Sequence, residues 1–223
     1  MTGLSLRPDT SPIKVLCLGA HADDIEIGCG GTILSLNQPH RQLYFHWIVF
    51  SAAGRRSQEA ERAADLFTSG SKKTVVLKQY RDGFLPYNGA EVKQFFEDLK
   101  EQVHPDLIFT HWRGDAHQDH RLISELTWNT FRNHLILEYE IPKYDGDMGR
   151  PNLFVPLEQA VCGRKVDLLL DAFESQRGKH WFDRETFLGL MRLRGMEANS
   201  PSAYAEAFHA SKVVLHPCPE WSL

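Results

Sequence analysis

Short apolar runs alternate with stretches of helical periodicity through the first half of the chain. The apolar runs lie at 13–19, 43–50, 74–78 and 106–111. Helical stretches separate them at 55–68 and 89–103, and a glycine-rich turn after the first run leads into a helix near 30–37. Runs that are apolar throughout suit strands buried on both faces. Their alternation with helices predicts an α/β fold built on a parallel sheet.

The second half of the chain continues this pattern less regularly. We expect a helix over 118–132, a half-exposed strand over 135–141, a helix over 158–174 and a final strand near 212–216. Residues 1–12 are polar and contain prolines, so we expect a flexible lead-in. No linker, repeat or low-complexity segment divides the remainder, which predicts a single domain over 13–223.

The composition narrows the class of protein. The 223 residues are 42% hydrophobic and 24% charged, which is near the average for globular proteins. The net charge is -4 with scattered Lys and Arg, so we expect no nucleic-acid partner. No apolar stretch is long enough for a membrane span, and we identify no signal peptide. Four widely spaced cysteines favour a reduced, cytoplasmic protein.

Histidine and aspartate gather directly after two of the predicted strands. His21-Ala22-Asp23-Asp24 follows the first run, and THWRGDAHQDH, at 110–120, follows the fourth. Open parallel α/β sheets bind their ligands at the carboxyl ends of the strands. Because both clusters fall at such ends, the sequence predicts that they contribute to one site.

The spacing of these residues suits a hydrolytic zinc site, which needs three protein ligands and an open position for water. His21 and Asp24 are three positions apart in a tight turn. His117 and His120 are three positions apart at the start of a helix, so they share a face, and one can bind metal while the other faces substrate. Zinc lowers the pKa of its bound water to about 7. Asp23 is placed to take the proton of that water.

Each of these residues also has an interpretation without a metal. Asp24 suits the N-cap of a helix, where aspartate is favoured. His117 and His120 suit an exposed helix start, and Asp119 suits the positive end of a helix dipole. The zinc hypothesis explains both clusters with one site, whereas these alternatives need separate coincidences.

The glycine-rich turn also invites comparison with a dinucleotide-binding motif. That motif needs G-x-G-x-x-G with an acidic residue about 20 positions later. Here Gly28 and Gly30 are followed by Gly31, position 33 is Ile, and the end of the next strand (VFSA, 49–52) carries no carboxylate. The sequence therefore argues against a dinucleotide site.

Two long motifs resemble those of a known family. GAHADDIEIGCGGTIL (19–34) and HPDLIFTHWRGDAHQDH (104–120) are similar to the paired motifs of the LmbE-like, or PIG-L, zinc-dependent N-deacetylases. RSQE (56–59) and AYAEAF (203–208) resemble two further elements of that family. The resemblance runs from about residue 13 to 210. It implies a three-layer α/β/α fold with a Rossmann-like, mostly parallel sheet and helices on both faces.

The resemblance also implies a role for each site residue. His21, Asp24 and His120 would bind one Zn²⁺ per chain, and Asp23 would be the general base. His117 would face the substrate, with Asp119 orienting it and favouring its charged form. Arg56 and Asp82 match positions that contact substrate. Ala22 departs from the family's usual proline, but this change removes no ligand.

From these motifs we expect hydrolysis of an N-acetyl group from an amino sugar or sugar conjugate. A zinc amidase acting on another small amide, such as a thiol conjugate, is the alternative within enzymes. A non-catalytic sugar-binding protein is the alternative outside them, because fold alone does not fix function. The expected partner is a small N-acetylated molecule, and the sequence leaves open whether the chain forms a homo-oligomer.

Overall fold

A computed structural model describes residues 12–37 and 42–214. Within them, seven strands form one sheet in the order β3-β2-β1-β4-β5-β7-β6. Strands β1 to β5 pair in parallel, and β7 pairs antiparallel with both β5 and β6. The strands are β1 (Ile13–His21), β2 (Leu43–Ser51), β3 (Lys72–Leu77), β4 (Leu107–His111), β5 (Leu135–Tyr139), β6 (Leu153–Pro156) and β7 (Ala205–His209).

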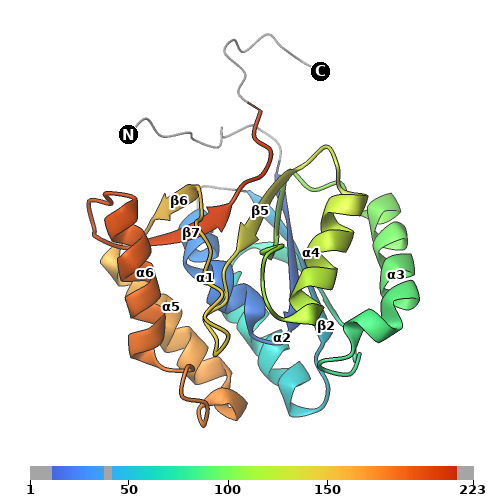
Figure 1. Ribbon diagram of the computed structural model, residues 1–223, viewed down its shortest axis with the longest axis horizontal. Helices are drawn as coiled ribbons and strands as arrows, with labels where there is room; N and C mark the ends of the chain where they lie inside the picture. Colours follow the sequence, from blue (N-terminus) through green and yellow to red (C-terminus); the bar gives the residue numbers. More distant parts are fainter. Residues whose placement is uncertain (1–11, 38–41, 215–223) are drawn as a thin grey trace.

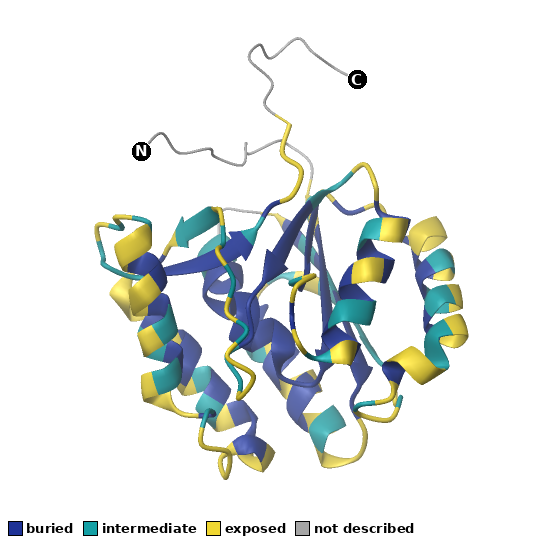
Figure 2. Cartoon of the chain, in the orientation of Figure 1, coloured by how far each residue is buried: buried dark blue, intermediate teal, exposed yellow. Residues whose placement is uncertain are grey.

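Helices cover both faces of this sheet (Figure 1). Helices α1 and α2 with α5 and α6 pack on one face, while α3 and α4 pack on the other. Figure 2 shows the buried strands between helices whose outer sides are exposed. The α-helices are α1 (Asp24–Leu36), α2 (Arg55–Phe67), α3 (Gly89–Gln102), α4 (Gln118–Thr130), α5 (Gln159–Ala172) and α6 (Arg184–Glu197).

The predicted fold class is confirmed, since the molecule has three α/β/α layers around a mostly parallel sheet. Alternate residues of each central strand face opposite helical layers. In β1, Val15 and Cys17 face α1 and α2, whereas Leu16 and Leu18 face α3 and α4. This two-sided burial is the physical reason that the apolar runs are continuous.

Four sequence expectations about elements need correction. Strand β5 ends at Tyr139 and is buried beyond Leu135, because it lies between β4 and β7, whereas we expected a half-exposed strand over 135–141. Helix α1 begins at Asp24, so the glycines near its start belong to a helix and not to a turn that precedes one. The last described strand is β7, whereas residues 212–214 form no strand and 215–216 lie outside the described residues. Strand β6 was not expected at all. Residues 1–11 of the predicted lead-in also lie outside the described part.

The glycines of α1 allow close packing of this helix. A Cβ atom at Gly28 would lie 2.2 Å from the Tyr139 ring, and one at Gly30 would lie 2.6 Å from Phe67. Cys29, between them, has non-helical backbone angles (φ -141°, ψ 15°), which kink the helix. The absence of side chains at Gly28 and Gly30 therefore lets a kinked α1 lie directly on β5 and α2.

None of the helices in the described ranges is long and apolar enough to cross a membrane.

Candidate metal centre

The candidate site lies where the order of the strands reverses. The chain runs outward from β1 through β2 to β3 and then returns to add β4 on the other side of β1. Neighbouring crossovers therefore leave in opposite directions at the ends of β1 and β4, which opens a crevice there. His21 ends β1 and His111 ends β4, and helices α1 and α4 begin beside them.

Three donor atoms from the predicted ligands form a nearly equilateral triangle. His21 Nδ1 lies 3.1 Å from His120 Nε2 and 3.3 Å from Asp24 Oδ2, and the latter two atoms are 3.5 Å apart. Ligands held at 2.0–2.2 Å by one tetrahedral ion lie about 3.4 Å from each other. The three side chains are also buried. Their donor types and spacing thus fit a zinc ion.

The charge around the triangle also suits a cation. Burial alone would lower the pKa of His21, yet Asp24, Asp119 and Asp82 together raise it well above its usual value. Asp82 Oδ1 and Asp119 Oδ2 each lie 3.2 Å from His21 Nε2. Carboxylates thus face both nitrogens of this ring, and such a concentration of negative charge stabilises a bound cation.

His120 is oriented by a buried aspartate behind it. Its Nδ1 donates to Asp115 Oδ2 at 3.0 Å, which leaves Nε2 directed at the other donors. Asp115 also accepts the backbone N–H of His117 at 2.7 Å and contacts the ammonium of Lys143 at 3.0 Å. Burial, followed by the nearby His111, lowers the pKa of His120 to about 4, so this ring is neutral at physiological pH. A neutral imidazole held by a carboxylate is the usual form of a zinc ligand.

His111 is a site residue to which the sequence analysis gave no role. Its Nε2 accepts the backbone N–H of Ala20 at 2.9 Å and lies 3.1 Å from Asp24 Oδ2. Its ring stacks on that of His120, with centroids 3.9 Å apart. Asp24, His111 and His120 also form a group that could hold an ion. Because the Nε2 lone pair of His111 is engaged by an amide, we place His111 behind the ligands. Its position at the carboxyl end of β4, the strand beside β1, was the available signal.

Asp23 is buried next to Asp24 and is paired with a cation. Its Oδ1 lies 3.2 Å from Arg56 Nη2, and Arg56 Nη1 contacts Asp82 Oδ2 at 2.9 Å. Burial, reinforced by the charge of Asp24, raises the pKa of Asp23, and Arg56 opposes this shift. Asp82, by contrast, has a lowered pKa, chiefly because His21 donates a hydrogen bond to it. The structure therefore places Arg56 and Asp82 at the site, next to the expected base.

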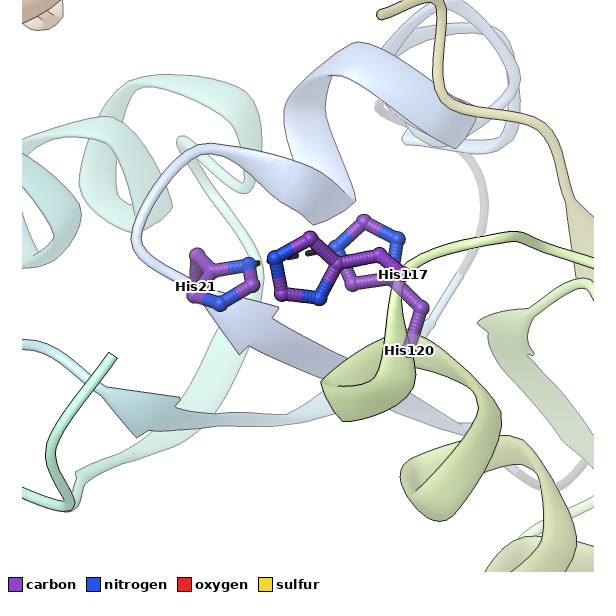
Figure 3. Close-up of side chains that lie close together, drawn as sticks. All are labelled: His21, His117 and His120. Atoms are coloured by element: carbon purple, nitrogen blue, oxygen red, sulfur yellow. Dashed lines mark hydrogen bonds between the residues drawn. The ribbon is translucent and has the colours of Figure 1, made fainter. Parts of the chain in front are cut away.

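His117 caps helix α4 and lies beside both predicted histidine ligands (Figure 3), with which it forms another group that could hold an ion. Its ring centroid is 4.8 Å from that of His21 and 4.6 Å from that of His120. Its Nδ1 accepts the backbone N–H of Asp119 at 3.2 Å. Since Nδ1 is an acceptor, the proton of the neutral ring is on Nε2. Burial and the charge of His21 lower the pKa of His117, which favours this neutral form.

The contacts of Asp119 differ from the sequence expectation. Its carboxylate accepts the backbone N–H groups of Gly83 and Leu85 at 2.8 and 3.1 Å and contacts His21. It meets His117 only through its own backbone N–H. Asp119 therefore ties the segment around Gly83 to His21. Its charge also favours the protonated form of His117, and the role toward His117 that the resemblance implies stays a prediction.

A Rossmann-like sheet with a buried His-Asp-His cluster at its switch point agrees with the fold and motifs of the LmbE-like class that the sequence resembles. The model of the PIG-L family, described as GlcNAc-PI de-N-acetylase, matches residues 16–131. The chain belongs to this family.

Known relatives extend the comparison. "Uncharacterized deacetylase YaiS" from Escherichia coli (strain K12) is 28% identical over 141 residues, which are 57% of this chain and 74% of that protein. N,N'-diacetylchitobiose deacetylase from Pyrococcus horikoshii, complexed with its inhibitor MPG, has a TM-score of 0.69 and 21% identity over 91% of this chain and 85% of its own.

A third protein has the same fold and a different reaction in its name. GalB, the 4-carboxy-2-hydroxymuconate hydratase from Pseudomonas putida KT2440, has a TM-score of 0.68 and 15% identity, covering 92% of this chain and 99% of its own. Structural likeness at these identities shows the fold alone. The function must therefore be argued from the site.

Proposed function

We propose that the protein is a zinc-dependent N-deacetylase acting on a small N-acetylated amino sugar or sugar conjugate. The single observation that supports this most is the donor triangle of His21, Asp24 and His120, with the buried Asp23 beside it. Three ligands leave the open position that a catalytic zinc requires, and a structural zinc would have four.

Zinc bound there would supply Lewis acidity, which polarises the acetamide carbonyl and acidifies water. Asp23 takes a proton from the attacking water, and its raised pKa brings it closer to the working pH of a general base. Arg56 holds the Asp23 carboxylate in place through its 3.2 Å contact. The Nε2–H of the neutral His117 ring can donate a hydrogen bond to the developing oxyanion, and the proton that Asp23 has taken from water passes to the leaving amine, which returns Asp23 to its carboxylate form.

The substrate class is supported by the names of the family and of a structural neighbour, both of which concern an acetamido sugar. Two segments tied to the site carry exposed apolar side chains that could contact the rest of the substrate. Phe84 and Tyr87 follow Gly83, which is bound to Asp119, and Tyr144 and Met148 flank Asp147, which accepts the N–H of Ala116. Aromatic faces of this kind pack against sugar rings and apolar aglycones.

The test is acetate release from a panel of N-acetylated amino sugars by protein that has been stripped with a chelator and then reloaded. We expect no release without metal and full recovery with one equivalent of zinc per chain. The panel should include a thiol conjugate of an N-acetylated amino sugar and, as a separate compound, an acetamide that contains no sugar. Turnover of only the non-sugar amide would replace the sugar proposal with the amidase. Zinc-loaded protein that binds these sugars without releasing acetate would overturn the enzyme proposal.

A further inference from the structure

The kink in α1 breaks the ladder of backbone hydrogen bonds inside that helix. In a regular helix, the N–H of residue 31 would bond to the carbonyl of Ile27. Cys29 leaves helical geometry, and the N–H groups of Gly31 and Thr32 donate elsewhere. Buried backbone groups without partners cost as much as lost hydrogen bonds. The kink must therefore have replacement partners.

A buried ion pair from the C-terminal third of the chain supplies these partners. Glu206, on β7, accepts the N–H groups of Gly31 and Thr32 at 2.8 and 2.6 Å. Lys165, on α5, donates to the carbonyl of Ile27 at 2.6 Å. The two charged groups are 2.6 Å apart, with exposed fractions of only 2% and 4%. The pair thus satisfies both donors that the kink releases and one of the acceptors, the carbonyl of Ile27.

The fit between the pair and the helix depends on glycine. A Cβ atom at Gly31 would lie 2.9 Å from Glu206 Oε1, so a larger residue would displace the carboxylate. The helical turn before the kink begins at Asp24, directly after the Asp23 N-cap. The backbone of that turn carries both carboxylates, and the kink, to which the ion pair is bound, joins this turn to the rest of α1.

We propose that Lys165 and Glu206 are positioning residues for the metal centre: inserted in the kink of α1, they aim Asp24 at the metal and Asp23 at its water. The inference rests on the proposed function. It assigns to this pair a role beyond stability, namely control of metal affinity and turnover from a position outside the site.

The test compares two charge-neutral double variants. Lys165→Met/Glu206→Gln removes the pair in α1, and Glu140→Gln/Arg194→Met removes a second buried pair, whose partners are 2.6 Å apart and make no described hydrogen bond to α1. Removing both charges together avoids a lone buried charge, so both variants should fold. Zinc affinity, amide hydrogen exchange of α1, kcat and KM are measured for each.

We expect the Lys165/Glu206 variant to bind zinc about tenfold more weakly, as with other residues that support metal ligands. Its Gly31 and Thr32 amides should exchange faster, and kcat should fall while KM stays unchanged. The Glu140/Arg194 variant should keep the zinc affinity of the wild type. Unchanged zinc affinity in the first variant, or an equal loss in both, would overturn the proposal. Failure of the wild type to bind zinc would instead overturn the proposed function.

Discussion

Side chains of the same chemical type face different partners at this site. Asp24 completes the donor triangle, whereas its neighbour Asp23 faces Arg56. His120 directs Nε2 at the other donors, whereas His117 uses Nδ1 to cap a helix and keeps its proton on Nε2. The two aspartates, and likewise the two histidines, differ in role because each side chain has different hydrogen-bonding partners.

Asp23→Asn should separate binding from chemistry. The asparagine side chain has the same shape as aspartate but cannot take up the proton, so the rate of acetate release should fall by about 10²–10⁴-fold. The zinc content, determined by elemental analysis, should remain that of the wild type because the donor triangle is intact. Asp65→Asn, at an exposed position on α2, is the matched control and should change neither quantity. Full activity of the Asp23 variant would show that another group is the base.

The helices and central strands were predictable because their apolar periodicity reflects local burial. Elements that depend on partners far along the chain could not be predicted from the sequence. The sequence of β7 is AEAFH, which has little β-propensity, but this segment forms a strand because it lies between β5 and β6. The Val-rich segment near 212–214 has the higher propensity but remains exposed and forms no strand.

The candidate site shows the same division. That His21, Asp24 and His120 come close together could be expected from the sequence, because each lies at a strand end or helix start, whereas the choice of His120 over His117 as a ligand came from the family resemblance. The contact between Asp119 and His21 did not, since it depends on how the loop around Gly83 packs. Likewise, the glycines of α1 resembled a turn because their packing partners, such as Tyr139, lie far along the chain.

Two glycines in helices should respond in opposite ways to alanine. In Gly28→Ala, the new methyl group would meet the buried Tyr139 ring at 2.2 Å, and overpacking of this kind costs about 1–3 kcal/mol. In Gly163→Ala, on α5, the methyl group meets nothing within 4 Å. Here the better helix propensity of alanine should stabilise the protein by up to about 1 kcal/mol. Urea unfolding of both variants measures the difference, and equal midpoints would contradict the packing argument.

At the scale of the whole molecule, the C-terminal third packs against the segment that follows β4. His209, at the end of β7, stacks on Trp112, which follows β4, with centroids 4.6 Å apart. Burial, followed by the charge of Arg194, lowers the pKa of His209 to about 4. The folded protein therefore favours the neutral form of this ring, and the junction between the two segments should be sensitive to acid.

The sign of this effect follows from proton uptake. Between pH 6.5 and 4 the unfolded chain protonates His209 while the folded protein does not, so its contribution to stability is complete near pH 7 and is lost as the pH falls. For a half-buried ring we expect a loss of about 1 kcal/mol, after allowance for solvent screening. His209→Gln should remove this part of the pH dependence. Urea unfolding of the wild type and the variant at about pH 7.5 and about pH 4.5, with chelator present, measures the loss of stability in each protein. An equal loss in both proteins would show that His209 does not cause this part of the pH dependence.

The position of β7 also has a consequence for how the chain is completed during synthesis. Strand β6 emerges from the ribosome before β7, yet its only described neighbour in the sheet is β7. Until β7 arrives, β6 has no place in the sheet and the edge of β5 stays open. The partners of the α1 kink, Lys165 and Glu206, also arrive late. A nascent chain therefore carries every proposed zinc ligand by residue 120 but lacks, until β7 emerges, one of the two groups that hold the kink of α1.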